Sequence, residues 1–557
     1  MRILVVQTTR MGDVIQTTPL ISAVRMRYPG AHITVMVRRM GKAVAERHPD
    51  VDDILVYDED QLYLDLAAGD SDRLLHAYEI ADERVQQLRA EHFDRAYNVT
   101  HSLSSAMLLK LAEIPEVVGA HLTDDWTFVL RADWAPYFFM SVLHREFNDL
   151  NLVDITRHFE PEADARQLRF NIHAADRAQV EALLKERGIT PDDALCCMQL
   201  GASEENKRWF EAHFADLARM LHDKHGLRIV LVGVQEEAPL GDVFEQHAPG
   251  LAVKLYGETS IPQLAALLER ARILVTNDTG TMHIAAAAGC PVTLVSVGHV
   301  HYRETGPYGE GHCAIEWRRA DLGSGYRVPT GLEERSLVQP GHVLHAVEAT
   351  LAFQAPGDIV QINETPDLEE IDLYLTRFAP DGCLAYYPLL RRPLLRRDFV
   401  RTAYRFMWLA TMDHYYRIAD EQASMEALLS CYEGPDAETR TAWADELAAN
   451  FSALADLAQR GIDATNALLE HLHSQGSMSA ARDMVTALMK LDEQMRIHSE
   501  MHPACRPLIV VARHERDNLE GADPIVLAET TRTIYDACRN RAQIFTQKAY
   551  RLASARA

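Results

Sequence analysis

The sequence predicts an α/β protein in two consecutive units, followed by an all-α C-terminal part. Short apolar runs rich in β-branched residues alternate with amphipathic helical stretches up to about residue 160, and the same alternation restarts near residue 190. After about residue 360, Ala, Leu, Met and Glu recur at helical spacing instead. Strand–helix alternation is typical of parallel sheets covered by helices. A length of 557 residues also allows two or three domains.

The first unit is assigned to residues 1–165. A helix is expected over 14–28, and further helical stretches separate the strands. The predicted strands are short, apolar segments bounded by turn residues, at 2–6, 32–37, 52–58 and 94–99.

The second unit is assigned to residues 166–356. Its predicted strands are 196–200, 228–233, 273–277 and 292–297, and its predicted helices are 207–224, 260–271, 280–289 and 341–354. Two such units in succession indicate two Rossmann-like halves that face each other. Ligands of these sheets bind at the C-terminal ends of the strands, so the functional residues are sought there.

The third part, residues 357–557, is predicted to be a bundle of six to eight helices of unknown role. Its segment 389–406, LLRRPLLRRDFVRTAYRF, contains six arginines among Leu and aromatic residues. One interpretation is a basic amphipathic surface that contacts anionic membrane or a phosphorylated lipid. The other is that the arginines pair with the abundant carboxylates or are simply solvated.

Composition excludes several classes of protein. Asp and Glu outnumber Lys and Arg by 81 to 56, a net charge of −25, which argues against a nucleic-acid binder. No apolar run approaches the ~20 residues of a transmembrane helix, and the N-terminal run is too short for a secretory signal. The eight cysteines form no CxxC pair, which favours reduced core thiols in a cytoplasmic protein.

The first candidate site, TTRMGD, directly follows the first strand. It contains Thr9 and Arg10, then Gly12, which allows a tight turn, and Asp13, which begins a helix. One interpretation is that Asp13 only caps that helix. The other is that its carboxylate faces the cleft and acts as a general base.

The second candidate site follows the strand at 196–200. Small residues including Ser203 precede Lys207 at the start of a helix. Backbone N–H groups, the helix dipole and the lysine charge would together bind a phosphate. The alternative is a solvated, basic helix start.

The third candidate site is the segment NDTGTMH, residues 277–283. It joins a strand to a helix of small residues, and its free N–H groups could bind a diphosphate. His283 could instead be purely structural. The segment lacks the GxxxxGK[ST] pattern of an ATPase loop. No metal-ligand spacing is evident, and His299 and His301 are expected to be exposed.

These three sites occur in order at strand ends of two consecutive units, and there the sequence resembles glycosyltransferase family 9, the ADP-heptose:lipopolysaccharide heptosyltransferases. The N-terminal match is RILVVQTTRMGDVIQTTPLISAVRMRYPGAHITVMV; the C-terminal matches are QLGASEENKRWF, RIVLVGVQEE, LYGETSIPQLAALLERARILVTNDTGTMHIAAAAGCPVTLVSVG and ETGPYG. They cover most of residues 1–353. The resemblance implies the GT-B fold, with two Rossmann-like domains facing across a cleft, and inversion at the anomeric carbon without metal or cofactor.

The resemblance also implies roles for individual residues. Asp13 matches the catalytic base, with Thr9, Arg10 and Gly12 beside it on the acceptor side. The implied donor-binding residues are Ser203, Lys207, Gln235, Glu237, Thr259, Asp278, Thr279, Gly280, Thr281 and His283. Which residue of 235–237 holds the ribose is left open.

The implied function is transfer of a sugar, expected to be heptose from ADP-heptose, to a lipopolysaccharide-core or other cell-surface glycan. The implied location is cytoplasmic, with peripheral contact at the inner face of the inner membrane as a further expectation. The sequence departs from the family at Gln7, where many members carry a basic residue, and Arg10 is the candidate replacement. Two alternatives stay open: a protein acceptor, and a non-catalytic scaffold that works through its helical part.

Overall fold

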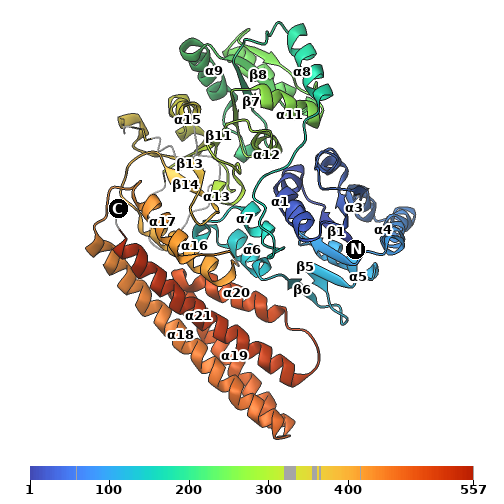
Figure 1. Ribbon diagram of the computed structural model, residues 1–557, viewed down its shortest axis with the longest axis vertical. Coiled ribbons are helices and arrows are strands. Elements are labelled where there is room, and N and C mark those ends of the chain that lie inside the picture. Colours follow the sequence, from blue (N-terminus) through green and yellow to red (C-terminus); the bar gives the residue numbers. More distant parts are fainter. Residues whose placement is uncertain (58, 319–333, 354–360, 363–364, 414, 556–557) are drawn as a thin grey trace.

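The computed structural model contains two α/β units and a helical extension (Figure 1). It describes residues 1–557 apart from 58, 319–333, 354–360, 363–364, 414 and 556–557. The predicted architecture is therefore confirmed, with differences in where the helical part begins.

The first sheet has the strand order β3-β2-β1-β4-β5-β6, with only the β5–β6 pair antiparallel. Its central strand, β1, is completely buried from Ile3 to Val6, because helices cover both faces of a parallel sheet. The strands are β1 (Arg2–Gln7), β2 (His32–Val37), β3 (Asp53–Val56), β4 (Arg95–Asn98), β5 (Glu116–Leu122) and β6 (Phe128–Arg131).

The helices of the first unit connect these strands. The first begins three residues before the predicted start, at Met11. The helices are α1 (Met11–Arg27), α2 (Lys42–Ala45), α3 (Glu59–Ala68), α4 (Ser71–Glu91), α5 (Leu103–Leu111), α6 (Trp134–Leu143) and α7 (Leu152–Arg157). Two 3-10 turns, η1 (Arg39–Gly41) and η2 (Arg145–Phe147), complete the unit.

The second sheet has the order β14-β13-β12-β11-β10-β7-β8-β9 and is parallel from β9 to β12. Its strands are β7 (Leu195–Gln199), β8 (Arg228–Val232), β9 (Ala252–Lys254), β10 (Ile273–Thr276), β11 (Val292–Val295), β12 (Cys313–Trp317), β13 (Ile371–Phe378) and β14 (Leu384–Pro388). The last two strands pair antiparallel and extend the sheet beyond β12.

These two strands correct the sequence-based division. An all-α part from residue 357 is wrong, because β13 and β14 belong to the second sheet. Residue 357 itself lies outside the described residues. Strand β14 was not predicted because it is short and rich in tyrosine. The other strands were recognised by their β-branched residues.

The helices of the second unit cover both faces of its sheet. They are α8 (Ala174–Glu186), α9 (Glu211–His225), α10 (Ala238–His247), α11 (Ile261–Arg270), α12 (Gly280–Ala287), α13 (Tyr302–Thr305), α14 (Glu334–Leu337) and α15 (Pro340–Ala352). Three 3-10 turns, η3 (Glu205–Lys207), η4 (Gln235–Glu237) and η5 (Pro366–Leu368), join them to strands or follow them.

The extension consists of α16 (Arg396–Met412), α17 (Ile418–Leu429), α18 (Ala437–His473), α19 (Met478–Met501), α20 (Arg506–Asp517) and α21 (Pro524–Ser554), with the turn η6 (Pro503–Cys505). The long helices α18, α19 and α21 form a rod that projects away from the α/β units (Figure 1). Stacked rings of Phe451 and Phe545, 4.0 Å apart, join α18 to α21. Gly461 allows the ring of Tyr535 to approach, because a Cβ there would lie 2.5 Å from it.

The extension also packs against the first unit. Asn518 donates to the carbonyl of Leu130 and accepts from its N–H, at 3.1 and 2.8 Å, and so covers the edge strand β6. The indole of Trp134 donates to the carbonyl of Met412 at 3.1 Å. The extension is therefore anchored on the first unit as well as on the sheet of the second.

The arginine-rich segment 389–406 does not form a basic surface. The side chains of Arg392, Arg401 and Arg405 are 6%, 8% and 2% exposed, and each forms ion pairs with aspartates. Of the six arginines, Arg391 is clearly exposed. The burial of Arg392, Arg401 and Arg405 against aspartates favours the second interpretation, and membrane contact by this segment is not shown. In the described part of the chain, no helix combines the length and the apolar character needed to cross a membrane.

Candidate functional site

The carboxyl edges of the two parallel sheets meet at Gly12 and Gly280. A Cβ at Gly12 would lie 2.7 Å from the His283 ring and 3.7 Å from the Gly280 Cα. A Cβ at Gly280 would lie 2.6 Å from the end of the Met11 side chain. Glycine at position 12 thus allows the two units to approach this closely, whereas at position 280 the end of the Met11 side chain could move aside. The structure brings the first and third candidate sites together.

Two helix N-termini converge at this contact, those of α1 and α12. The residues that precede them, Arg10 and Thr279, have extended backbones, and neither side chain accepts a hydrogen bond from a helix N–H group. The first N–H groups of a helix lack intrahelical partners and carry partial positive charge. Two such ends in one place form a strong candidate site for an anion.

Asp13 lies in the first turn of α1 and accepts two hydrogen bonds. The Arg10 N–H donates to Oδ2 at 3.1 Å, and the Thr9 hydroxyl donates to the same oxygen at 2.7 Å. Asp13 therefore does cap its helix, but the cap uses one oxygen only. Within the described residues Oδ1 accepts no hydrogen bond, and it remains available to an acceptor hydroxyl.

The residues beside Asp13 form a hydrogen-bonded chain. The Thr9 hydroxyl approaches the side-chain oxygen of Gln7 at 2.6 Å, and the amide of Gln7 donates to Thr17 at 3.1 Å. Gln7 is only 5% exposed, whereas Arg10 is exposed. The Thr9 hydroxyl lies within hydrogen-bonding distance of both Gln7 and Asp13, and its single proton can go to only one of them at a time. Whether Arg10 replaces the missing basic residue stays a prediction.

Lys207 is a buried cation at the carboxyl edge of the second sheet. Its side chain is 4% exposed, and its Nζ lies 3.7 Å from carboxylate oxygens of both Glu204 and Asp278. A Cβ at Gly298 would lie 2.8 Å from the Lys207 side chain, so glycine there makes room for it. The second and third candidate sites are thereby joined. Ser203 is exposed nearby in the chain and makes no side-chain contact that identifies a role.

Asn277 is a positioning residue that sequence reasoning missed. Its side chain is completely buried, accepts from the Trp209 N–H at 2.9 Å, and donates to the Leu200 carbonyl at 2.9 Å. It ties the end of β10 to the end of β7 and to the start of α9. Asn277 lies within the third candidate segment, directly after an apolar strand, but roles were predicted only for Asp278 and the residues that follow it.

Glu237 lies over the ends of β7 and β8. Its Oε2 accepts from the Gln199 amide at 2.8 Å and from the Val234 N–H at 3.0 Å. A Cβ at Gly201 would lie only 1.6 Å from Oε1, so the carboxylate fills the space that this glycine leaves. Of residues 235–237, Glu237 turns inward, which makes it the better candidate for a ribose ligand.

Two further predicted donor residues lie beside it, on the outer part of the site. Gln235 is exposed, with its side chain against Gly257, and Thr259 is half-buried directly before α11. Their predicted contacts with the donor remain predictions.

The remaining residues of the donor loop line the start of α12. The hydroxyl of Thr279 lies 3.3 Å from that of Thr276, and the hydroxyl of Thr281 donates to Gln199 at 3.4 Å. Burial lowers the pKa of His283, and the nearby Asp278 and Asp13 carboxylates oppose that shift only in part. A neutral His283 therefore lies between the predicted base and the predicted diphosphate site.

An ion pair between the units was not foreseen. Arg145 of the first unit lies 2.9 Å from Glu304 of the second and donates to the His299 carbonyl at 3.0 Å. Burial raises the pKa of Glu304 to about 7, and Asp278 adds to the rise. His301, expected to be exposed, is 6% exposed because it precedes the buried helix α13. No sequence motif identifies Arg145 and Glu304, which are 159 positions apart.

Cofactor and metal chemistry is not indicated by the donor set of the cleft. In the part of the chain that the structure describes, no three His, Cys, Asp or Glu side chains gather as metal ligands would. Whether the reaction needs a metal stays a prediction.

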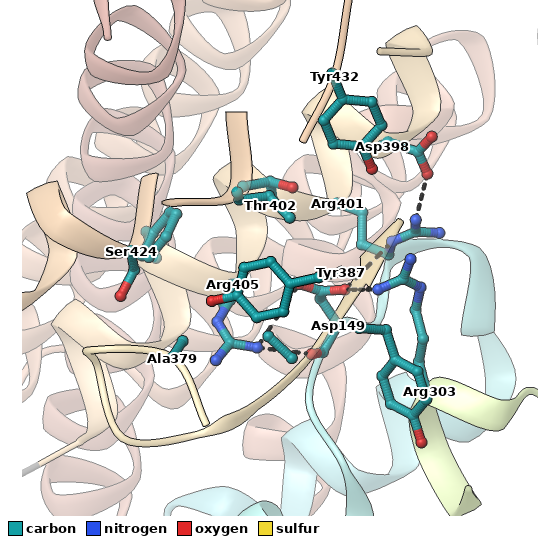
Figure 2. Close-up of a pocket in the computed structure, with 14 residues that line it drawn as sticks. Asp149, Arg303, Ala379, Tyr387, Asp398, Arg401, Thr402, Arg405, Ser424 and Tyr432 are labelled. Carbon is teal, nitrogen blue, oxygen red and sulfur yellow. Dashed lines mark hydrogen bonds and ion pairs between the residues drawn. The ribbon is translucent and has the colours of Figure 1, made fainter. Parts of the chain in front are cut away.

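A second cluster of buried charges lies at the junction of the extension with the two units (Figure 2). Asp149 accepts from Arg303 at 2.8 Å and also lies near Arg401 and Arg405, at 3.5 and 3.7 Å. Arg405 pairs with Asp381 as well, at 2.8 Å. The cavity between them measures about 20 Å³, the space of about one water molecule. This cluster, which we call the hub, has no room for a ligand and joins the three parts of the chain.

Comparison with known proteins finds similarity to heptosyltransferases. Residues 83–319 match glycosyltransferase family 9 (heptosyltransferase). The chain is 26% identical over 324 residues to lipopolysaccharide heptosyltransferase 2 of Escherichia coli K12, which covers 53% of this chain and 82% of that protein. It is 25% identical over 336 residues to lipopolysaccharide heptosyltransferase 1 of the same strain, with 58% and 95% covered.

A solved structure resembles the two α/β units. It is the glycosyl transferase family 9 protein of Veillonella parvula DSM 2008, with a TM-score of 0.51 and 20% identity. The similarity covers 63% of this chain and 97% of that one. At this identity the likeness concerns the fold, and it supports the two facing Rossmann-like units of the expected GT-B arrangement.

Proposed function

We propose that this chain, whose residues 83–319 match the model of glycosyltransferase family 9, is an inverting glycosyltransferase that uses a nucleotide-sugar donor. The proposed donor is ADP-heptose, and the proposed acceptor is a lipopolysaccharide-core or other cell-surface glycan, by analogy with the named relatives. The observation that carries the proposal is the meeting of Asp13 with the N-terminus of α12 across Gly12 and Gly280.

The proposed reaction is a direct displacement at the anomeric carbon of the donor sugar. Oδ1 of Asp13 takes the proton of the acceptor hydroxyl, and the acceptor oxygen forms a bond to the anomeric carbon. The bond from that carbon to the phosphate oxygen breaks, and its electron pair leaves with ADP. Attack from the face opposite the leaving group inverts the configuration.

The proposed role of the second unit is to stabilise the charge that develops on the leaving diphosphate. Lys207 and the first N–H groups of α12 are aimed at one region, next to Asp278. Preorganised donors of this kind contribute about 3 kcal/mol each in related systems. With this positive charge supplied by the protein, we propose that the reaction needs no metal.

The direct test is turnover of ADP-heptose by the full-length protein. We expect ADP release, with slow hydrolysis in the absence of acceptor, and unchanged rates in EDTA. Loss of activity in EDTA with rescue by Mg²⁺ or Mn²⁺ would contradict the metal-free proposal. Mass spectrometry of surface glycans from a strain that lacks the gene should show loss of one sugar, and intact glycans would point to a different acceptor.

The protein-acceptor alternative uses the same donor geometry and is favoured by the acidic, apolar surface described below. A non-catalytic scaffold is less well supported, since it would need neither a free carboxylate oxygen on Asp13 nor a buried lysine next to Asp278. The proposal includes a cytoplasmic location. The burial of Arg392, Arg401 and Arg405 weakens the argument for membrane contact by segment 389–406.

A further inference from the structure

The helical hairpin formed by α3 and the first half of α4 exposes an unusual density of large apolar side chains. Six of them lie within residues 63–78 and are 45% to 67% exposed: Tyr63, Leu64, Leu66, Leu74, Leu75 and Tyr78. Contiguous exposed apolar surface on a globular protein commonly marks an interaction site. The hairpin lies at the outer end of the first unit, away from the extension (Figure 1).

Its position relative to the sheet is fixed by two contacts. Glu91 at the end of α4 pairs with Arg2 at the start of β1, and Arg84 donates to the carbonyl of Val56 at the end of β3. Residues 71–83 therefore extend beyond the carboxyl edge of the sheet, by about 20 Å at 1.5 Å per residue. That edge also holds Thr9 and Asp13.

A third contact holds the start of α3 to the carboxyl end of β2. Arg38, which follows the end of β2, lies 3.1 Å from Glu59 and 3.0 Å from Asp60 at the start of α3. A partner that docks on the hairpin would thus lie next to the acceptor side of the site.

The charge of the hairpin indicates which kind of partner fits. Residues 59–84 contain eight carboxylates against two arginines, and Asp72, Glu79 and Glu83 are exposed among the apolar side chains. An anionic membrane would repel such a surface, because the headgroups carry the same sign. A second copy of this chain would bring two acidic surfaces together. A helix with apolar and basic faces would match both properties.

We propose that the α3–α4 hairpin is the docking site for a basic, amphipathic segment of a partner protein. The partner is either the glycosylated protein or a carrier that presents the acceptor, and this placement next to Asp13 rests on the proposed function. The docking itself does not, because binding to the hairpin requires neither donor nor turnover.

The test measures binding of the full-length protein to a synthetic helical peptide of Leu and Lys, about 18 residues long, or five turns. We expect binding that weakens about tenfold in the triple variant Leu74→Ser, Leu75→Ser, Tyr78→Ser. The double variant Val485→Ser, Met489→Ser on α19 is the matched control, since those side chains are 45% and 66% exposed. It should bind the peptide as the unchanged protein does.

Charge is tested by Asp72→Asn with Glu79→Gln, which should weaken binding and reduce its dependence on salt. A matching peptide of Leu and Glu should not bind. Equal peptide binding by the hairpin and α19 variants would overturn the proposal. Two other results would also overturn it. One is binding of the protein to vesicles of phosphatidylcholine and phosphatidylglycerol that is lost in the triple variant. The other is a dimer of the unchanged protein in sedimentation that becomes a monomer in the triple variant. Retained ADP affinity in each variant separates these outcomes from a failure of the proposed function.

Discussion

The chain contains two clusters of buried charge that differ in how fully their groups are paired. In the hub, Arg405 pairs with Asp381 and also donates to the carbonyls of Asp149, Cys383 and Leu384, at 2.9 to 3.1 Å. In the cleft, Lys207 lies 3.7 Å from its nearest carboxylates. Within the described residues, Nδ1 of His283 makes no hydrogen bond, whereas Oε2 of Glu304 lies 2.9 Å from Arg145.

This difference separates a structural cluster from a functional one. Burying a charge is costly, and it is tolerated where partners satisfy it. The charges of the hub are paired and its cavity is closed, although Nε of Arg303 and the hydroxyl of Tyr386 make no hydrogen bond within the described residues. The hub therefore mainly joins three parts of the chain. The cleft keeps unused hydrogen-bonding capacity, which a ligand would fill. Buried charge alone therefore identifies neither, and the incomplete pairing in the cleft is what indicates a binding site.

The largest effect is expected when the hub is broken. Arg405→Ala leaves the buried carboxylate of Asp381 without its cation, a loss of about 3–5 kcal/mol in unfolding free energy. We expect a lower midpoint in urea unfolding or failure to accumulate as soluble protein. Arg417→Ala is the control, because that side chain is 77% exposed and its pair with Asp420 contributes little. Similar stability of the two variants would contradict the structural role of the hub.

The two clusters also differ in how far their positions could be predicted from the sequence. Asp13, Lys207 and the 278–283 loop were predictable because local motifs follow recognisable strands. The partition at residue 357 was not, because β13 obtains its place from pairing with β12, which lies more than 50 residues earlier, and β14 pairs with β13. The inward direction of Arg401 and Arg405 depends on Asp149, about 250 residues away. A chain cut near residue 357 is therefore expected to lose sheet and hub together.

In the cleft, the substitution with the largest expected effect is Asp13→Asn. The amide oxygen can still accept from the Arg10 N–H, so the helix cap and the fold should persist, but the base is gone. We expect kcat to fall by about 10²–10⁴, the usual contribution of a general base. ADP affinity, measured by calorimetry, should stay the same. Transfer at the unchanged rate would mean that Asp13 serves only as a cap.

A smaller loss is expected for Lys207→Ala, which tests whether the incompletely paired cation serves the ligand. Removing a charge-assisted hydrogen bond to phosphate costs about 1.5–3 kcal/mol, so the Kd for ADP should rise by about 10- to 100-fold. Lys254→Ala on the same unit is the control, since its side chain is 38% exposed at Asp242. Unchanged ADP affinity in Lys207→Ala would move the diphosphate site elsewhere.

The smallest effect is expected at Glu304, and it depends on pH. With a pKa raised to about 7 by burial and by Asp278, Glu304 is mainly neutral at pH 6 and mainly negative at pH 8. A carboxylate next to Asp278 repels a diphosphate, although Arg145, 2.9 Å away, offsets part of that repulsion. Glu304→Gln should therefore bind ADP as the unchanged protein does at pH 6, and about threefold more tightly at pH 8.

Stability gives an independent reading of the same group. The pKa of Glu304 is higher in the folded protein, about 7, than in the unfolded chain, near 4.5. Its contribution to the free energy of unfolding is therefore complete below pH 4.5 and is lost as the pH rises through about 7. Glutamine does not titrate, so Glu304→Gln should gain in Tm relative to the unchanged protein between pH 5 and pH 8. Titration of ADP itself is common to both proteins and cancels in the comparison. If the two proteins keep a constant Kd ratio and a constant Tm difference over this range, Glu304 does not change its charge near pH 7, and the cleft is more fully paired than its geometry indicates.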